Sequence, residues 1–175
     1  RASIGPASLC LHWGILILFV AHLAGFIGGA YELTFWVDFF RWVGFAGGIL
    51  FLYGATWALV RRVVIPQVKA MSTPDDYIVL LFLIVIDGLG LYQAAVEMVF
   101  GISYSAGPWI GSIFTLQPDA SMMAGAPFIN KLHIIVSLFF FAYFPFTKLV
   151  HVGSYPFGYI TRSFISMRRY LALKK

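Results

Sequence analysis

Long apolar runs separated by short polar segments dominate the sequence. Four of the runs are long enough to cross a bilayer, since a spanning helix needs about 20 mostly apolar residues. They cover residues 9–29, 42–60, 77–101 and 128–152. The composition agrees, because 11% of the residues are charged, against about 25% in soluble domains. The pattern predicts an all-α membrane protein with four visible transmembrane helices that form an antiparallel bundle.

The segments between the runs contain the expected helix boundaries. Residues 72–76, Ser-Thr-Pro-Asp-Asp, predict a helix start, because Ser or Thr caps a helix, proline suits its first turn and acids face the positive end of its dipole. Residues 102–127 predict an interfacial loop with a short helix in the membrane plane. Pro145 predicts a kink in the fourth run, since proline interrupts the hydrogen bonds of a helix. Nothing divides residues 1–175, so we expect a single domain.

The positions of lysine and arginine predict the orientation in the membrane. Arg61, Arg62 and Lys69 follow the second run, and five further basic residues lie in residues 153–175. Both segments fall on one side when four helices alternate, and the excess of positive charge assigns that side to the cytoplasm. We therefore expect a multi-pass protein of the cytoplasmic (inner) membrane with a basic cytoplasmic tail over residues 153–175. Topology also accounts for the net charge of +5, so no nucleic acid partner is expected.

All four histidines lie within two of the apolar runs. His12 and His22 belong to the first run, and His133 and His151 belong to the fourth. An ionisable side chain in hydrocarbon is costly and is therefore a candidate functional residue. Because these two helices run in opposite directions, His22 pairs with His133 near the outer face, and His12 pairs with His151 near the inner face.

The two histidines of the first run are closer together along the chain than the two histidines of the fourth run. Ten residues separate His12 from His22, which is about 15 Å along a helix. Eighteen residues separate His133 from His151, which is about 27 Å and about five turns, so both would face one side of the helix. We expect helix tilt and the kink at Pro145 to absorb this difference.

Two imidazoles without a carboxylate or a thiolate favour haem over a bare metal ion. Zinc sites have three or four protein ligands, and copper sites usually add sulfur. Haem needs only two axial ligands. The chain has no Cys-x-x-Cys-His, which excludes covalent attachment, and Cys10, the only cysteine, excludes an iron–sulfur cluster held by this chain alone. The pattern predicts a bundle that encloses two bis-histidine b haems.

The alternative is that the histidines form hydrogen bonds between helices, which four histidines at matching depths disfavour. Glycines in the runs would leave room for flat macrocycles or allow close helix packing. They are Gly14, Gly25, Gly44, Gly47, Gly48, Gly88 and Gly90.

Several segments resemble one known family. Residues 11–22 begin with Leu-His-Trp-Gly-Ile-Leu and end with Val-Ala-His; residues 131–151 begin with Lys-Leu-His and end with Phe-Pro-Phe-Thr-Lys-Leu-Val-His. Together with residues 115–120 and 159–162, they resemble the gamma subunit of respiratory nitrate reductase, the membrane dihaem cytochrome b of that family. The likeness covers nearly the whole chain. Family members typically have five helices, so we expect a further helix before Arg1.

The resemblance implies the roles of the four histidines. His22 and His133 would hold the iron of the outer haem, and His12 and His151 that of the inner haem. A quinol, menaquinol or ubiquinol, would be oxidised near the outer haem. Electrons would then pass inward to an iron–sulfur beta subunit and to a molybdenum alpha subunit that reduces nitrate. This chain would contain no nitrate-reducing site and no acid–base catalytic residue.

The resemblance also places a quinol pocket beside the outer haem. Gly25 matches a family glycine, whereas a family lysine has no counterpart in residues 38–41. Arg41 is the nearest cation, and it is either a quinol ligand or an interfacial anchor. Glu97 would accept a quinol proton or reach the headgroups. Asp87, near the middle of the third run, should face protein or water, as a proton relay, a contact to the haem edge or a structural hydrogen bond.

The histidines in the apolar runs also suit two other functions. The same dihaem module is found in sulfite-reduction-associated and heterodisulfide-reductase complexes, although residues 115–120 and the tail resemble the nitrate reductase branch. A proton or ion transporter would use the histidines and Asp87, but the chain lacks inverted repeats and paired broken helices. The basic tail would contact anionic lipid and dock the iron–sulfur subunit.

Overall fold

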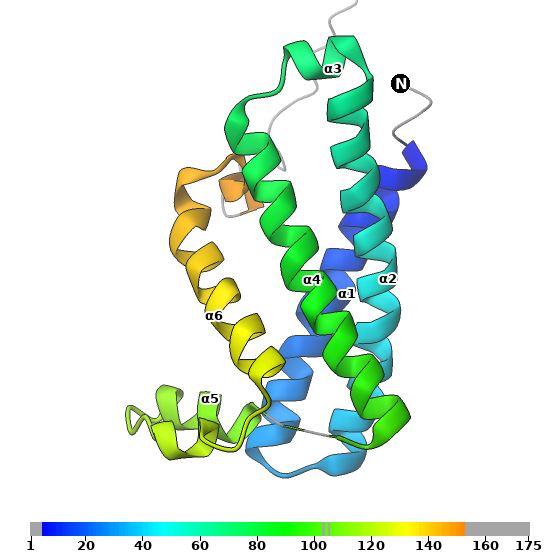
Figure 1. Cartoon of the computed structure of the whole chain (residues 1–175). Coiled ribbons are helices and arrows are strands. Elements are labelled where there is room, and N and C mark those ends of the chain that lie inside the picture. Colours follow the sequence, from blue (N-terminus) through cyan, green and yellow to red (C-terminus); the bar gives the residue numbers. More distant parts are fainter. Residues whose placement is uncertain (1–4, 103, 105, 153–175) are drawn as a thin grey trace, which may run out of the picture.

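Four long helices form the body of the protein. The computed structural model describes residues 5–102, 104 and 106–152, with side chains up to residue 150. The long helices are α1 (Gly5–Ala30), α2 (Thr34–Val64), α4 (Pro74–Phe100) and α6 (Phe128–Tyr143) (Figure 1). The short ones are α3 (Pro66–Ala70), α5 (Gly107–Phe114) and the 3-10 helices η1 (Ala120–Met123), η2 (Phe144–Phe146) and η3 (Lys148–Val152). In this described part, four helices are long and apolar enough to cross a membrane, which confirms the predicted fold class.

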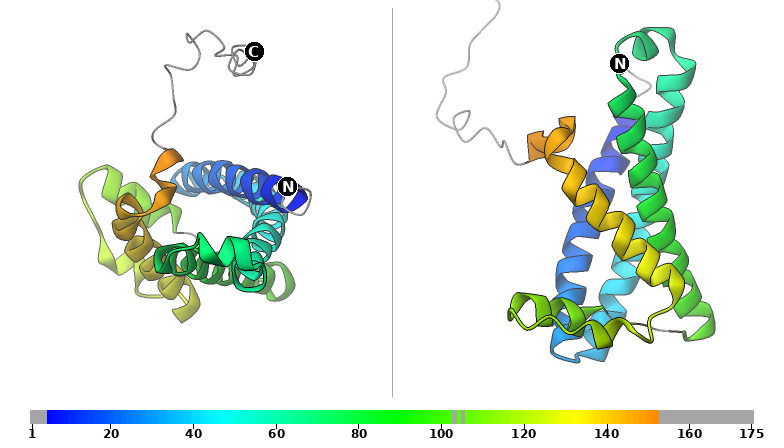
Figure 2. Two further views of the ribbon diagram at one scale, coloured as in Figure 1. Left: turned by 90° about the horizontal axis from the view of Figure 1, so that it is seen from above. Right: turned by 60° about the vertical axis from the view of Figure 1, so that its left-hand side comes forward.

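The long helices form a ring. Seen from above in Figure 2, they follow one another in the order α1, α2, α4 and α6. α1 packs closely on α2, α2 on α4 and α4 on α6, whereas α1 and α6 do not pack closely on each other. We call the end that carries Arg61, Arg62 and Lys69 the basic end. The opposite end, which α5 crosses, is the α5 end (Figure 1).

Small residues allow α1 and α2 to approach each other closely. One face of α1 buries a small residue at every seventh position: Ala7, Gly14, Ala21 and Gly28. A methyl group added to Gly14 would lie 2.5 Å from the backbone nitrogen of Phe51, and one added to Gly54 would lie 2.6 Å from that of Leu11. A seven-residue repeat keeps one helix face against its partner, and small side chains let membrane helices meet backbone to backbone.

The outer surface of the bundle is strongly apolar. Trp13 is 58% exposed, Phe19 65% and Leu138 56%. Water-soluble monomers rarely expose large continuous apolar patches, but lipid tails solvate such side chains. The surface therefore agrees with the four helices in describing a membrane protein.

The second helix begins earlier than the sequence predicts. α2 starts at Thr34, not at residue 42, so Asp38 and Arg41 lie on the helix and not in a loop. The connection from α1 is short, because Glu32 adopts a left-handed conformation with φ of 56°. The indole of Trp36 donates to the carbonyl oxygen of Ala24 at 3.0 Å, which ties the start of α2 to the end of α1.

Two predicted boundary features are confirmed. Thr73 precedes α4, and its backbone N–H donates to the Asp76 carboxylate at 2.9 Å, as in a capping box. The loop after α4 contains the expected short helix, α5, which lies across the end of the bundle (Figure 2). α5 starts against α1, where a methyl group added to Gly107 would lie 2.6 Å from the Cα atom of Gly29.

The predicted continuous helix over residues 128–152 is wrong. α6 ends at Tyr143, and the chain continues as η2 and η3. Pro145 has no N–H to continue the helical ladder, so it ends the α-helix instead of kinking it. His133 and His151 therefore do not lie on one helix face, and the 27 Å separation does not apply. The predicted basic tail, residues 153–175, lies outside the described residues.

Candidate functional site

The imidazole rings of His22 on α1 and His133 on α6 lie close to each other. Their ring centroids are 6.4 Å apart, and the ring planes differ by 9°. The two helices do not pack closely on each other, so the imidazoles meet where the backbones stay apart. The structure thus brings together the two histidines that antiparallel packing pairs.

Both rings are oriented by hydrogen bonds to backbone carbonyl groups. The Nδ1 atom of His22 donates to Leu18 at 2.7 Å, and that of His133 donates to Ile86 at 3.0 Å. A carbonyl oxygen only accepts hydrogen bonds, so Nδ1 is the donor in each ring, and a neutral imidazole then has its lone pair on Nε2. Histidines that bind metals use this arrangement, in which the second nitrogen donates to a carbonyl or a carboxylate.

The separation of the two rings suits two imidazoles that would bind one metal ion. A metal–imidazole bond is about 2 Å long. Because each ring centre lies about 1 Å behind its nitrogen, two rings on opposite sides of one metal ion have centroids about 6 Å apart. The observed 6.4 Å between His22 and His133 agrees with this value.

A bare metal ion would need more protein ligands than this site offers. Within the described part of the chain, no three His, Cys, Asp or Glu side chains lie close enough to bind one ion. Two neighbouring imidazoles suit a cofactor that brings the remaining donors itself, as a porphyrin does. The donor set therefore fits haem.

Hydrogen bonding between helices does not explain all the histidines. The Nδ1 atom of His12 donates to Ser8 at 2.7 Å, and that of His22 donates to Leu18, each within α1. Among the hydrogen bonds of the described histidine side chains, only the one from His133 to Ile86 joins two helices. The rings of His12 and His22 are exposed on α1, which leaves them open to a bound group.

The second pair is described only in part. His12 lies on α1 toward the basic end, whereas its predicted partner, His151, belongs to η3. The backbone of η3 is described and turns toward α1 beyond the end of α6 (Figure 2). The His151 side chain lies outside the described residues, so the pairing of His12 with His151 stays a prediction.

The glycines of the apolar runs differ in their surroundings. Four of them fill close helix contacts, where an added methyl group would meet a neighbouring helix: Gly14, Gly44, Gly47 and Gly48. Gly25 and Gly88 have no atom within 4 Å of such a methyl group. A methyl group on Gly90 would lie 3.3 Å from Cε1 of His133. The prediction of room for macrocycles therefore does not apply to the first four.

Arg41 forms ion pairs with two acids near the α5 end. Its guanidinium lies 2.6 Å from Asp38 on α2 and 2.6 Å from Glu97 on α4. The Arg41 and Glu97 side chains are 20% and 17% exposed, so this pair is largely shielded from solvent. The sequence gives no local signal that the two residues meet, because they are 56 positions apart.

Asp87 is buried between α4 and α2. The residue is 7% exposed, and a methyl group added to Gly48 would lie 3.1 Å from its Oδ1 atom. Its Oδ2 atom has no hydrogen-bond partner among the described residues. Asp87 thus faces protein, as predicted for an acid at this depth.

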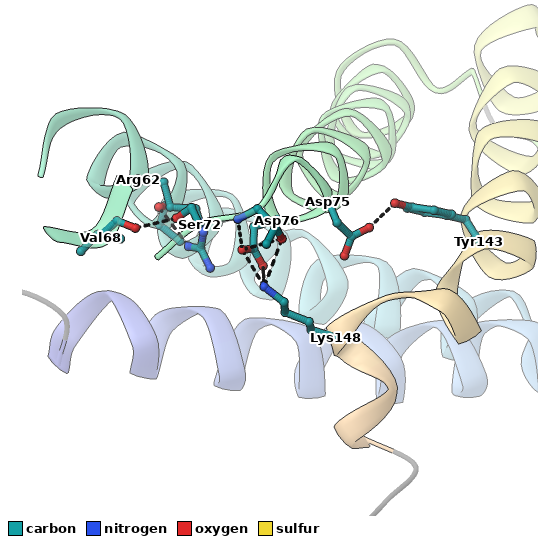
Figure 3. A network of polar contacts seen from close by, with 9 residues as sticks. Arg62, Val68, Ser72, Asp75, Asp76, Tyr143 and Lys148 are labelled. Atoms are coloured by element: carbon teal, nitrogen blue, oxygen red, sulfur yellow. Dashed lines mark hydrogen bonds and ion pairs between the residues drawn. The ribbon is translucent and has the colours of Figure 1, made fainter. Parts of the chain in front are cut away.

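A polar network at the basic end is not predicted by the sequence. Tyr143 and Lys148 of the α6–η3 segment contact Asp75 and Asp76 at the start of α4 (Figure 3). The capping pattern predicts the contact of Asp76 with Thr73 but not its contact with Lys148. Such contacts depend on where the fourth helix ends, which the apolar pattern does not reveal.

Comparison with known proteins identifies the family. Residues 1–170 match the family described as the nitrate reductase gamma subunit. The chain belongs to this family. Membership confirms the predicted resemblance and agrees with the four apolar helices of the described part of the chain.

Individual relatives extend the comparison. The respiratory nitrate reductase 1 gamma chain of Escherichia coli is 31% identical over 178 residues, which cover 96% of this chain and 79% of that protein. The nitrate reductase-like protein NarX of Mycobacterium tuberculosis is 32% identical over 179 residues. The match covers 93% of this chain but only 27% of that protein. One of the subunits of the dihydromethanophenazine:CoB–CoM heterodisulfide reductase of Methanosarcina acetivorans is 31% identical over 112 residues, 62% of this chain and 36% of that protein.

Proposed function

We propose that this chain is the quinol-oxidising dihaem cytochrome b of a nitrate reductase complex. It would take electrons from a quinol, menaquinol or ubiquinol, and deliver them across the membrane to an iron–sulfur beta subunit and a molybdenum alpha subunit that reduces nitrate. The observation that carries the proposal is the neighbouring pair His22 and His133, whose rings are 6.4 Å apart and whose Nε2 atoms are left available by the Nδ1 hydrogen bonds.

Four histidines would hold the two b haems. His22 and His133 are proposed as ligands of the outer haem iron, and His12 and His151 as ligands of the inner haem iron. Haem supplies one-electron redox chemistry when bound. The part of the protein would be to hold the rings: the carbonyl groups of Leu18 and Ile86 accept hydrogen bonds from Nδ1 of His22 and His133, which would leave each Nε2 to bind the iron.

Gly25 and Arg41 are proposed to contact the quinol. The space beside Gly25 is open, since no atom lies within 4 Å of an added methyl group, and a flat ring can approach the helix there. A guanidinium has five N–H donors, so Arg41 keeps donors for a quinol oxygen while it binds Asp38 and Glu97. Glu97, next to Arg41, would accept a proton that the quinol releases. No acid–base catalytic residue is assigned beyond this.

The proposed orientation places the basic end in the cytoplasm. Arg61, Arg62 and Lys69 lie at this end, and membrane proteins retain Lys and Arg in their cytoplasmic segments. The α5 end would face outward, so electrons would move inward while quinol protons are released outside. The basic tail, residues 153–175, would lie at the cytoplasmic face, bind anionic lipid and dock the iron–sulfur subunit.

Haem content of the purified complex tests the proposal. We expect two b haems per chain, and we expect His22→Ala and His133→Ala to remove the same haem. His12→Ala serves as the matched control, because it changes a histidine of the same helix and should remove the other haem. A chain that folds without haem, or loss of different haems from His22→Ala and His133→Ala, would contradict the proposal.

A second candidate is the same electron-transfer module in a different complex. The similarity to a heterodisulfide reductase subunit favours this alternative. Proteins that co-purify with the chain distinguish the two functions. Quinol-dependent nitrate reduction by the isolated complex supports the nitrate reductase assignment, and its absence from a complex with both haems supports the alternative.

A further inference from the structure

The chain beyond α6 is attached to the start of α4 at two points. Tyr143 is the last residue of α6, and Lys148 is the first residue of η3. Tyr143 donates its hydroxyl hydrogen bond to Asp75, and Lys148 pairs with Asp76 (Figure 3). Two consecutive acids of one helical turn thus hold Tyr143 and Lys148, the residues on either side of the four-residue segment 144–147.

The contact of Lys148 is the more extensive of the two. Its Nζ atom lies 2.9 and 3.0 Å from the two carboxylate oxygens of Asp76 and 3.1 Å from Oγ1 of Thr73. The Asp76 side chain is only 12% exposed, and its carboxylate also accepts the Thr73 backbone N–H. The Asp76 carboxylate is therefore held by the start of α4 independently of its contact with Lys148.

Between the two anchors, the backbone is closed by local hydrogen bonds. Thr147 is 3% exposed, and its hydroxyl donates to the carbonyl oxygen of Phe144 at 2.8 Å and accepts the N–H of Leu149 at 3.2 Å. Short 3-10 helices have poorer hydrogen-bond geometry than α-helices. The local bonds lie within the turn, whereas the contacts of Tyr143 and Lys148 join its two ends to α4.

We propose that Asp75 and Asp76 are positioning residues for the inner haem. By holding Tyr143 and Lys148, they fix the backbone of η3, in which His151 lies one 3-10 turn beyond Lys148. A functional metal ligand must be held to within about 0.5 Å by its supporting contacts. His133 is supported by α6, whereas His151 lies beyond the end of α6 at Tyr143 and needs other support. This inference rests on the proposed role of His151 as an inner haem ligand.

The test uses the complete membrane complex and compares its two haems. Lys148→Met removes the ion pair and leaves the helix cap of α4 intact. We expect loss of the inner haem, or a shift of its low-spin electron paramagnetic resonance and its midpoint potential, with the outer haem unchanged. Lys148→Arg keeps the positive charge and should restore the inner haem. Tyr143→Phe should shift the same resonance through the second anchor.

Asp38→Asn is the matched control, because it removes an ion pair of Arg41 at the opposite end and should leave the inner haem unchanged. An unaltered inner haem in Lys148→Met would overturn the inference while leaving the dihaem assignment intact. Equal loss of both haems would also overturn it, since that indicates general unfolding and not the placement of one ligand. Retention of both haems in His151→Ala would instead contradict the proposed function.

Discussion

The imidazole rings of His22 and His133 lie with their planes 9° apart, and a backbone carbonyl group fixes each ring through Nδ1. The two carbonyl groups belong to different helices, since Leu18 is on α1 and Ile86 is on α4. The pair therefore depends on three helices, because His133 itself is on α6. A change on α4 can alter the site without touching either histidine.

Gly90→Ala should disturb the outer haem from α4. The added methyl group would lie 3.3 Å from Cε1 of His133, so the ring must yield slightly, and a shift away from its preferred rotamer costs about 1 kcal/mol. We expect a shifted midpoint potential and resonance of one haem in a folded protein. Gly88→Ala is the control, because no atom lies within 4 Å of its methyl group. Equal effects of the two variants would exclude this explanation.

Gly14→Ala and Gly25→Ala should have opposite effects on stability. The first places a methyl group 2.5 Å from the Phe51 backbone and should push α1 from α2, at a cost of about 1–3 kcal/mol as for other overpacked contacts. The second meets no atom within 4 Å and should leave the protein stable or raise its stability by about 0.5–1 kcal/mol, since alanine favours helices. Thermal unfolding in detergent measures both values.

Gly25→Ala also tests the proposed quinol pocket. If the ring of the quinol lies against Gly25, the methyl group should raise the KM for quinol and leave both haem spectra unchanged. Steady-state quinol oxidation measures this change, with Gly88→Ala as the control. An unchanged KM would place the quinol elsewhere.

The Arg41–Glu97 pair should contribute more than an exposed ion pair. Exposed pairs are worth about 0–1 kcal/mol, whereas breaking a buried pair costs about 3–5 kcal/mol. With side chains 20% and 17% exposed, we expect Arg41→Gln to cost about 1–3 kcal/mol. A double-mutant cycle with Glu97→Gln measures the coupling of the two side chains. Additive effects of the two substitutions would show that the pair is energetically negligible.

Pro145→Ala should lengthen α6. Alanine restores the missing N–H and favours the α-helix, so η2 would become helical and η3 would move away from Asp76. We expect the inner haem to be lost and the outer haem, held by His133 before the break, to be retained. Visible and resonance spectra distinguish the two haems. Retention of both haems would mean that the segment after Tyr143 tolerates a continuous helix.

Local chemistry made part of the fold predictable. Each of the four apolar runs overlaps one of the four long helices, because the length and hydropathy needed to cross a bilayer are properties of a continuous segment. The cap at Thr73 was likewise visible, since its bond to Asp76 spans only three residues. The depth of each histidine followed from its place in a run, and this was sufficient to pair His22 with His133.

The tertiary structure decided what depends on distant neighbours. Gly14 and Gly25 lie on the same helix, but only the packing of α2 makes the first a contact and leaves the second open. In the sequence Arg41 has no nearby signal for a partner on another helix, whereas the packing of α2 on α4 places it beside Glu97.

The sequence alone determined the membrane fold, the family and the four candidate ligands, because these reside in composition, spacing and local hydrogen bonding. Only the tertiary structure showed that α6 ends at Tyr143 and that Lys148 of η3 pairs with Asp76, because a proline permits both a kinked and a terminated helix and the partner of Lys148 lies 72 positions away.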